Sequence, residues 1–325
     1  MSVNEVAMDS NQAFRSRLRA ISARWWALPR VVKSITSHPL NRGRTVKALS
    51  RFVGWQIASR LASGPIVLPW VNDVRFVARQ GDTGITGNIY CGLHEYADMA
   101  FVLHAITPQD FFVDVGANVG SYVLLACGAA GARGLALEPV PSTYARLMDN
   151  LLVNNLLGRV RAINSGASES EQTLYFSADQ DTTNHVVAGP LDENSTKTIA
   201  VPTVPIDAIL DGTDATVLKI DVEGYELEVI RGAQKTLSKA NAVIIEINGS
   251  GARYGHSDAE VVAELVRLGL SPYRYLPDEY RLVPADSGDV EHSGNMLFVR
   301  DPRRFDDALA RRLRYRLNLG EWISV

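Results

Sequence analysis

The sequence FFVDVGANVGSYVLLA, residues 111–126, restricts the fold more than any other stretch of the chain. Its apolar run FFVDV is too short for a buried helix and stops at a glycine, which predicts a central parallel strand. Gly116 and Gly120 allow the backbone to approach a ligand closely, in conformations that other residues avoid. A helix that begins near Val119 would direct its free N–H groups at the same ligand. The stretch therefore predicts a ligand-binding turn between a strand and a helix.

Strand-like and helix-like patterns alternate around this turn. The predicted strands are 111–115, 134–138, 160–164, 217–221, 242–247, 273–276 and 295–299. Repeated strand–helix units imply a mostly parallel sheet with helices on both faces, connected by right-handed crossovers. We expect one α/β domain over residues 69–300, which begins with a hairpin that pairs 74–78 with 87–90.

The two ends of the chain differ from this domain. Residues 1–60 contain eleven Lys or Arg and two acidic residues, whereas the remainder contains 22 basic and 34 acidic residues. We expect a basic, helical N-terminal extension over residues 1–68 and a helical C-terminal tail over residues 301–325. The basic arm, which includes Trp25 and Trp26, can meet anionic lipid, nucleic acid, an anionic glycan carrier, the acidic body or a partner subunit. Between these ends, the polar segment 179–197 is expected to form a substrate-facing loop.

Composition excludes several classes of protein. No stretch reaches the roughly 18 to 20 uncharged apolar residues of a membrane span, and the first residues lack a signal-peptide pattern. We therefore expect a soluble, cytoplasmic protein. Cys91 and Cys127 fit neither a CxxC pair nor a zinc spacing, so both are expected to be reduced and structural.

The spacing of the glycine turn distinguishes between cofactors. A nicotinamide or flavin site would read G-x-G-x-x-G, whereas residues 114–120 read D-x-G-x-N-x-G. A Walker loop would place Lys and Ser or Thr after the second glycine, and this chain has Ser121 and Tyr122 there. The turn therefore favours a cofactor without phosphates. Glu138 ends the second predicted strand, where a carboxylate can accept hydrogen bonds from two ribose hydroxyls.

Three segments carry a family resemblance: VDVGANVG, ALEPVPSTYARLMDN and VLKIDVEGYELEVIRGA. Together they resemble the FkbM family of S-adenosylmethionine-dependent methyltransferases, which has a seven-stranded Rossmann-like fold. The resemblance runs from about residue 87 to residue 299 and implies S-adenosylmethionine as the cofactor. It implies that the cofactor is bound by Glu95, Asp114, Gly116, Asn118, Gly120, Glu138, Pro139, Ser165, Ala167, Ser168, Asp221, Glu223 and Gly224. The chain departs from the family at Ser168-Glu169, where the family often has aspartate, so the adenine contacts stay open.

The second motif contains the candidate catalytic residues. Methyl transfer is a direct displacement, so an enzyme must align an oxygen nucleophile and help to remove its proton. Asp221 is the first candidate for the base or for substrate orientation, with Lys219 and Glu246 as further candidates. The alternative is that these charges form a buried ion-pair network. Asp221, Glu246 and His256 could gather a divalent cation, but their spacing is not that of a metal motif and we predict no metal.

We expect an S-adenosylmethionine-dependent O-methyltransferase that acts on a hydroxyl of a sugar, glycan or polyketide-like metabolite. Methylation of nitrogen or of protein is the alternative within enzymes. The segment DVEG stands where base-methylating enzymes have [ND]PP[YFW], and the body is acidic, so nucleic acid is disfavoured. A protein of a different class, a non-catalytic cofactor binder that uses the basic arm for assembly, stays open, and so does a dehydrogenase. The oligomeric state, including a homo-oligomer, stays open.

Overall fold

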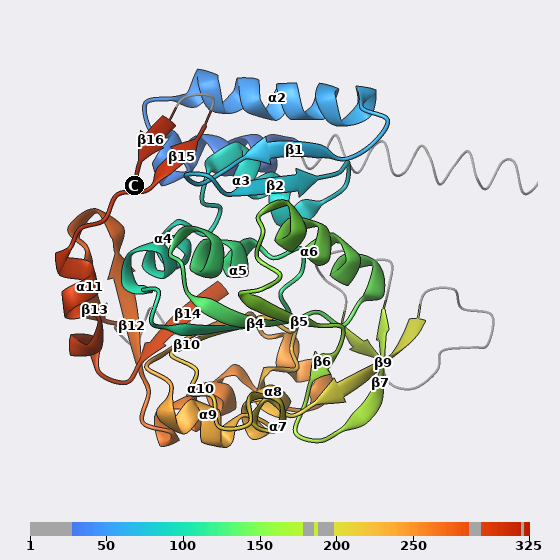
Figure 1. The fold of residues 1–325 in the computed structure, drawn as a ribbon, viewed down its shortest axis with the longest axis vertical. Coiled ribbons are helices and arrows are strands. Elements are labelled where there is room, and N and C mark those ends of the chain that lie inside the picture. Colours follow the sequence, from blue (N-terminus) through green and yellow to red (C-terminus); the bar gives the residue numbers. More distant parts are fainter. Residues whose placement is uncertain (1–27, 178–184, 188–197, 286–293, 320–321) are drawn as a thin grey trace, which may run out of the picture.

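The computed structural model describes residues 28–177, 185–187, 198–285, 294–319 and 322–325. Trp25, Trp26 and most of the predicted loop at 179–197 lie outside the described residues. Within the described part, helices cover both faces of a large central sheet, and α2 with a small hairpin adds a further layer at one end (Figure 1).

The central sheet has eight strands. In spatial order these are β13 (Arg281–Pro284), β12 (Ser271–Leu276), β14 (Gly294–Val299), β11 (Ala242–Ile247), β10 (Val217–Ile220), β3 (Phe111–Val115), β4 (Arg133–Leu137) and β5 (Val160–Ile163). The five strands from β11 to β5 are parallel, while β14, β12 and β13 pair with their neighbours in antiparallel fashion. This confirms the mostly parallel α/β sheet, with β13 as one edge strand more than the seven predicted.

Helices cover the two faces of the sheet in separate groups (Figure 1). One group comprises α4 (Tyr96–Ala105), α5 (Ser121–Val123) with its π-helical continuation η2 (Leu124–Ala129), and α6 (Pro141–Val153), while α3 (Thr83–Cys91) lies in the further layer beside α2 (Figure 1). The other comprises α7 (Ile206–Leu210), α8 (Glu226–Arg231), α9 (Gln234–Lys239) and α10 (Asp258–Arg267). Short 3-10 turns occur at η1 (Pro39–Asn41), η4 (Ser250–Tyr254) and η5 (Pro277–Glu279).

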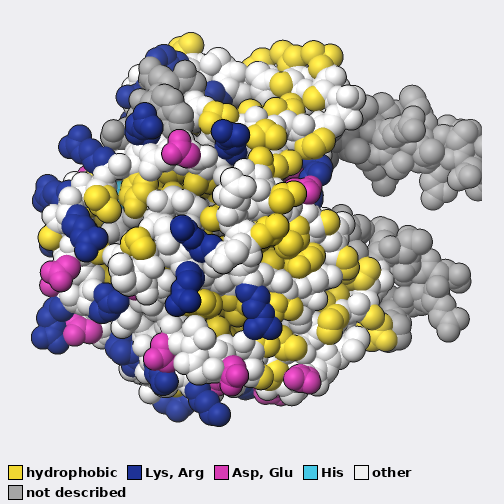
Figure 2. All heavy atoms as spheres, viewed as in Figure 1, with side chains coloured by type: hydrophobic (Ala, Val, Ile, Leu, Met, Phe, Trp, Pro, Cys, Tyr) yellow, Lys and Arg dark blue, Asp and Glu magenta, His cyan; other side chains and the backbone are white. Residues whose placement is uncertain are grey.

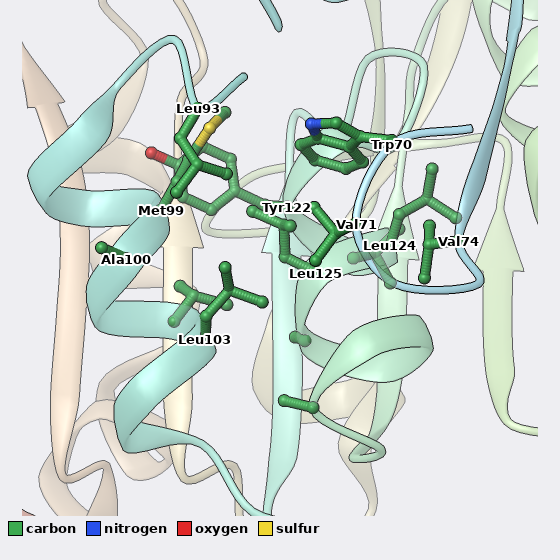
Figure 3. Packing of buried hydrophobic residues seen from close by; sticks show 14 of the residues in the cluster. Trp70, Val71, Val74, Leu93, Met99, Ala100, Leu103, Tyr122, Leu124 and Leu125 are labelled. Carbon is green, nitrogen blue, oxygen red and sulfur yellow. The ribbon is translucent and has the colours of Figure 1, made fainter. Parts of the chain in front are cut away.

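The central strands are buried on both faces, so they read as apolar runs rather than as alternating sequences. Phe112 of β3 packs into the core beside α4, and its neighbour Val113 packs into the core on the opposite face. Figure 3 shows Met99 and Leu103 of α4 beside Tyr122 and Leu125 in the first of these cores. The central position of β3 follows from this two-sided burial, and it places the glycine turn in the middle of the sheet edge.

A second, smaller sheet interrupts the alternation where the sequence becomes polar. Its strands are β6 (Gly166–Ala167), β9 (Thr198–Val204), β7 (Gln172–Ser177) and β8 (Val186–Val187). The antiparallel pair β7–β9 brings Phe176 and Val201 into a small apolar cluster. This sheet lies beside β5 and leads the chain back to β10 (Figure 1).

The N-terminal part is helical from residue 28, as predicted, and also contains a hairpin. Residues 28–37 form a helix and α2 (Thr45–Leu61) follows, then β1 (Ile66–Pro69) pairs with β2 (Arg75–Ala78). The predicted pairing of 74–78 with 87–90 is wrong, because residues 87–90 belong to α3. Ile85 is buried and Ile89 packs against the same core one turn later, which is a helical spacing that a four-residue window does not reveal.

The C-terminal tail is only partly helical, which corrects the prediction for residues 301–325. After η6 (Pro302–Phe305) and α11 (Asp306–Ala310), the chain forms an antiparallel pair from β15 (Arg316–Asn318) and β16 (Trp322–Ser324). Tyr315, Leu317 and Leu319 are buried in turn, which is the two-residue period of a strand. Leu317 also bridges to Val71, so the two ends of the chain pack on one core. The division at residues 68 and 300 stays a prediction.

Two findings bear on the expectations from composition. Cys91 and Cys127 are free and buried, as predicted. Among the helices that the structure describes, none is long and apolar enough to cross a membrane.

Candidate active site

A cavity of about 450 Å³ opens where β3, β4, β10 and β11 end. It lies at the carboxyl edge of the parallel strands, where open α/β sheets bind ligands. All of the predicted site residues line it except Gly120, Ser168 and Gly224. The three motifs that are distant along the chain therefore meet in one place.

Gly116 forms the floor of the cavity and cannot carry a side chain. Its φ of 77° lies in the left-handed region, and a Cβ atom there would stand 1.9 Å from the backbone oxygen of Asp221. The backbone N–H groups of Gly116 and Ala117 donate to the Leu137 carbonyl at 3.0 and 2.9 Å. This glycine thus lets the turn after β3 lie directly against the segment after β10.

Gly120 serves the turn from the other side. Its φ is 96°, and a Cβ atom would stand 2.7 Å from Cδ1 of Leu147 on α6. The helix begins one residue later, at Ser121, rather than near Val119. Gly120 therefore permits close packing between the turn and α6, and it does not line the cavity.

Asp114 is a buried carboxylate at the end of β3. Its Oδ2 accepts a hydrogen bond from the backbone N–H of Val123 at 3.0 Å. Burial raises the pKa of Asp114 to about 7, although the positive charge of Lys219 opposes the shift. The side chain is thus held rigidly by the first turn of the following helix.

Glu138 joins the ends of β3 and β4. Its Oε2 accepts from the N–H of Asn118 and its Oε1 from the N–H of Val140, both at 2.9 Å. Burial raises the pKa of Glu138 to about 7, against the effect of these two N–H donors. Each carboxylate oxygen can accept a second hydrogen bond, so the fixed carboxylate can still bind adjacent hydroxyls.

A charged cluster occupies the other wall of the cavity. Lys219 is 1% exposed, and its Nζ lies 3.0 Å from Oδ2 of Asp221 and 5.3 Å from the centre of the Tyr122 ring. Burial alone would lower the pKa of Lys219, but Asp221 and Glu95 outweigh it and raise this pKa. The cavity therefore contains a buried cation enclosed by carboxylates.

Glu246 completes this cluster from the end of β11. Burial, and then the negative charge of Asp221, raise the pKa of Glu246 to about 8. Its Oε2 is buried and has no hydrogen-bond partner among the described residues. Glu223, which has a φ of 55°, also has a pKa raised by burial to about 7.

Three carboxylates in this cluster lie close enough to hold one cation. Ligand oxygens of Asp221, Glu223 and Glu246 all lie within 4.8 Å of one another. His256, which was considered beside Asp221 and Glu246, is not part of this group, and its Nε2 lies 3.2 Å from Oε2 of Glu228. The absence of a metal stays a prediction.

The predicted adenine stretch contributes only part of the cavity wall. Ser165 and Ala167 line it, and the Ser165 hydroxyl donates to the carbonyls of Gly166 and Pro202. Ser168 faces away from it, and its Oγ accepts from Gln172 at 2.9 Å.

Gly224 also has a packing role. Its N–H donates to Glu226 at 3.0 Å, and a Cβ atom on it would stand 2.6 Å from the backbone oxygen of Ser250. It therefore shapes the segment after β10 from outside the cavity.

Several residues of the cavity wall escaped prediction, among them Tyr122, which lies below Lys219, and His94. Asn295 does not line the cavity but contacts a residue that does. Asn295 of β14 donates to Oε1 of Glu95 at 2.7 Å and so fixes this predicted residue. Tyr122 was within reach of sequence reasoning, since it lies in the first turn after Gly120, but Asn295 was not.

The residues present fit S-adenosylmethionine. The turn at Gly116 lines the cavity, and Glu138 is positioned for ribose hydroxyls. Glu95, Asp114 and Asp221 line the same cavity and favour a ligand that carries positive charge, such as a sulfonium and an amino group. The acidic wall disfavours a cofactor that carries phosphates.

The curated proteins whose sequences are similar to this chain include methyltransferases. The hexuronic acid methyltransferase AglP of Haloferax volcanii is 29% identical over 151 residues, which cover 45% of this chain and 59% of AglP. The methyltransferase sdnD of Sordaria araneosa is 26% identical over 232 residues, 60% of this chain and 88% of that protein. The match to AglP thus spans less than two thirds of its length.

Among solved structures, a SAM-dependent O-methyltransferase from Thermotoga maritima is 17% identical, with 62% of each chain covered and a TM-score of 0.32. The fold class described here rests on the strand order of this chain and not on that likeness.

The family model of the methyltransferase FkbM domain matches residues 114–272. The match begins at Asp114 and contains Glu138, the second motif and Glu246. It therefore covers the turn after β3, Glu138 and most of the charged cluster that lines the cavity. Residues 114–272 are thus similar to the methyltransferase FkbM domain, and this similarity indicates S-adenosylmethionine as the cofactor.

Proposed function

We propose that the protein transfers a methyl group to a hydroxyl oxygen of a sugar, a glycan or a polyketide-like metabolite. The observation that carries the proposal is the position of Glu246: its side chain lines the same cavity as Gly116 and Glu138, and one of its carboxylate oxygens has no hydrogen-bond partner among the described residues. A hydroxyl must lose its proton as it attacks, so a carboxylate with a raised pKa at this point suits an oxygen acceptor.

The three charged residues take different roles in this proposal. Bound S-adenosylmethionine supplies an electrophilic methyl group. Lys219 holds Asp221 in place through their ion pair, and Asp221 orients the acceptor hydroxyl. Glu246 accepts the hydroxyl proton on its carboxylate, which lines the cavity beside Asp221. A pKa of about 8 places this group close to the range in which a general base is most effective.

The acceptor class is supported by a relative and by the cavity wall. AglP is a hexuronic acid methyltransferase by name, which supports a sugar acceptor for this chain. The cavity wall offers carboxylate and amide groups, from Asp221, Asn88 and Asn118 among others, and such groups hydrogen-bond hydroxyls well.

The test is methyl transfer from labelled S-adenosylmethionine to a panel of acceptors. The panel contains hexuronic acid glycans, neutral sugars, hydroxylated polyketides, peptides and amines. We expect label in the sugar or polyketide fractions, in an alkali-stable ether. Label in an alkali-labile ester would show transfer to a carboxyl group instead. Label in peptides or amines would contradict the proposal, and cofactor binding without turnover on any acceptor would favour a non-catalytic binder.

A pair of variants links turnover to the site. Glu246→Gln keeps the size of the side chain and removes the proton acceptor, so it should lower turnover strongly. Glu279→Gln changes an exposed glutamate, which pairs with Arg281, and should leave turnover unchanged. Equal turnover in the two variants would remove Glu246 from the mechanism.

A further inference from the structure

The outer face of α2 exposes a continuous apolar stripe. Its members are Val46, Val53, Ile57 and Leu61, which are 82, 51, 54 and 81% exposed. They are spaced by seven, four and four residues, so they lie on one side of the helix. Figure 2 shows hydrophobic side chains gathered at the end of the molecule where Figure 1 places α2.

The opposite face of the same helix explains why this stripe is not needed for folding. Ala48, Trp55 and Ser59 are buried against the body of the protein. Gln56 donates to the hydroxyl of Tyr90 on α3 at 2.8 Å, which fixes the rotation of α2. The stripe therefore stays exposed while the opposite face of α2 is packed on the body of the protein.

The segment of the chain that contains the stripe carries only positive charges. Residues 28–64 contain seven Lys or Arg and no Asp or Glu. Arg60 and Lys47 are exposed on α2 itself, and Arg42 is exposed just before it. An apolar stripe with a basic border is typical of helices that lie in the interface of an anionic membrane.

Charge also indicates which kind of partner can bind this surface. A second copy that used the same surface would bring seven further positive charges against the first seven. Residues 1–27 carry four arginines and two acidic residues, so they too bear net positive charge. An anionic bilayer offers both an apolar layer and opposite charge, and the acidic remainder of the chain is repelled from it, which favours a single orientation.

We propose that the α2 stripe, Val46, Val53, Ile57 and Leu61 with its basic border, docks the protein onto anionic lipid membranes as a peripheral contact. The side chains enter the boundary between headgroups and acyl chains, and the basic residues meet the lipid phosphates. Since α2 packs on α3, and Gly84 and Asn88 of α3 line the cavity, docking brings the cavity within one helix layer of the lipid. This inference does not depend on the identity of the methyl acceptor.

The test is co-sedimentation of the full chain with vesicles of phosphatidylcholine, with and without phosphatidylglycerol. We expect binding only to the vesicles with phosphatidylglycerol, and a loss of binding as salt is raised, because salt screens the phosphate contacts. Val53→Asp with Ile57→Asp should weaken binding by about tenfold or more, since it places two charges in the apolar stripe.

The matched control is Leu152→Asp with Val266→Asp. These side chains are 61 and 50% exposed on α6 and α10, away from the stripe, so the control makes the same chemical change and should bind as wild type. Thermal melting of both variants confirms that they fold.

Three results would overturn the inference. The first is that the folded wild type does not bind the vesicles. The second is that the two double variants bind equally. The third is that the wild type forms a dimer in sedimentation velocity and that Val53→Asp with Ile57→Asp dissociates this dimer. The last result would identify a second copy as the occupant of the stripe.

Discussion

Glu138 shows how a single buried carboxylate serves both the fold and the site. It accepts N–H groups from the glycine turn and from the start of α6, and so ties the ends of two strands together. The same carboxylate lines the cavity. Burial disfavours the charged form of such a carboxylate, but ligand binding requires the carboxylate at this position.

Asp114 should make folding less favourable as the pH rises from about 4 to 7. Its pKa is raised by burial from 3.8 to about 7, so the folded state keeps a proton that the unfolded state releases between these values. Its contribution to stability is therefore lost as the pH rises from about 4 to 7. Asp114→Asn cannot titrate, so between pH 5 and 8 the wild type should lose about 1–3 kcal/mol of unfolding free energy relative to the variant. Denaturant unfolding at both pH values checks this, and parallel pH dependence would contradict it.

Glu246 should set the pH dependence of turnover. If it accepts the acceptor's proton, kcat/KM should rise about tenfold per pH unit and level off above pH 8, where the carboxyl is ionised. Glu246→Gln should lower kcat by roughly 10²- to 10⁴-fold and remove this rise. A rise that persists in Glu246→Gln would assign it to another group, such as Glu223.

At the scale of elements, the close approach of two strand ends creates the cavity. The turn after β3 and the segment after β10 meet at Gly116, where the Asp221 carbonyl occupies the space that a Cβ atom would need. The sequence shows the two glycines but not their different functions. Gly116 meets the segment after β10, whereas Gly120 meets α6.

Gly116→Ala should separate these strand ends. The variant should lose about 2–4 kcal/mol of unfolding free energy, because the left-handed φ is disfavoured and the new atom overlaps the Asp221 carbonyl. Gly249→Ala is the matched control, since Gly249 has the same φ of 77° with nothing within 4 Å of an added Cβ. It should lose only about 1 kcal/mol. Equal losses in chemical denaturation would show that the contact with Asp221 is unimportant.

Sequence reasoning succeeded where an element has a strong local pattern. The buried strands β3, β4, β10 and β11 were predicted within about a residue, because each is an apolar run that ends at a polar or glycine residue. It failed for α3 and for β15, whose patterns are short and depend on contacts with distant segments.

The site, like the fold, could be predicted where its residues follow strands with a strong local pattern. Asp114, Glu138 and Asp221 follow strands and so fall at one sheet edge by topology alone. The direction of a loop side chain is not given by topology, and so the sequence did not show that Glu223, and not His256, lies beside Asp221 and Glu246.

At the scale of the whole molecule, Arg51 connects α2 to α3 and to the C-terminal segment. Arg51 of α2 donates to the carbonyls of Leu319 and Tyr90, both at 2.7 Å, and to Oδ1 of Asn41 at 2.6 Å. One guanidinium thus connects α2, α3, the segment before α2 and the C-terminal strands. Its planar group of donors suits such a junction, which a lysine could not reproduce.

Arg51→Ala should loosen this junction. We expect a loss of about 2–4 kcal/mol in the free energy of unfolding, because three buried acceptors lose a charged donor. Arg60→Ala removes an arginine on the same helix whose hydrogen bonds go only to Gln56 among the described contacts, and it should cost less than about 0.5 kcal/mol. Equal melting of the two variants would contradict the role of Arg51.

The central claim is that the cavity at the sheet edge binds S-adenosylmethionine through the turn at Gly116 and through Glu138. Calorimetric titration of wild type, Glu138→Ala and the exposed-site control Glu171→Ala with S-adenosylmethionine, and with NAD as a comparison, tests it most directly. We predict binding of S-adenosylmethionine but not of NAD, and a loss of about 1–3 kcal/mol in Glu138→Ala alone, the scale for losing hydrogen bonds to a charged group. Unchanged affinity in folded Glu138→Ala, or no binding by folded wild type, would contradict the account.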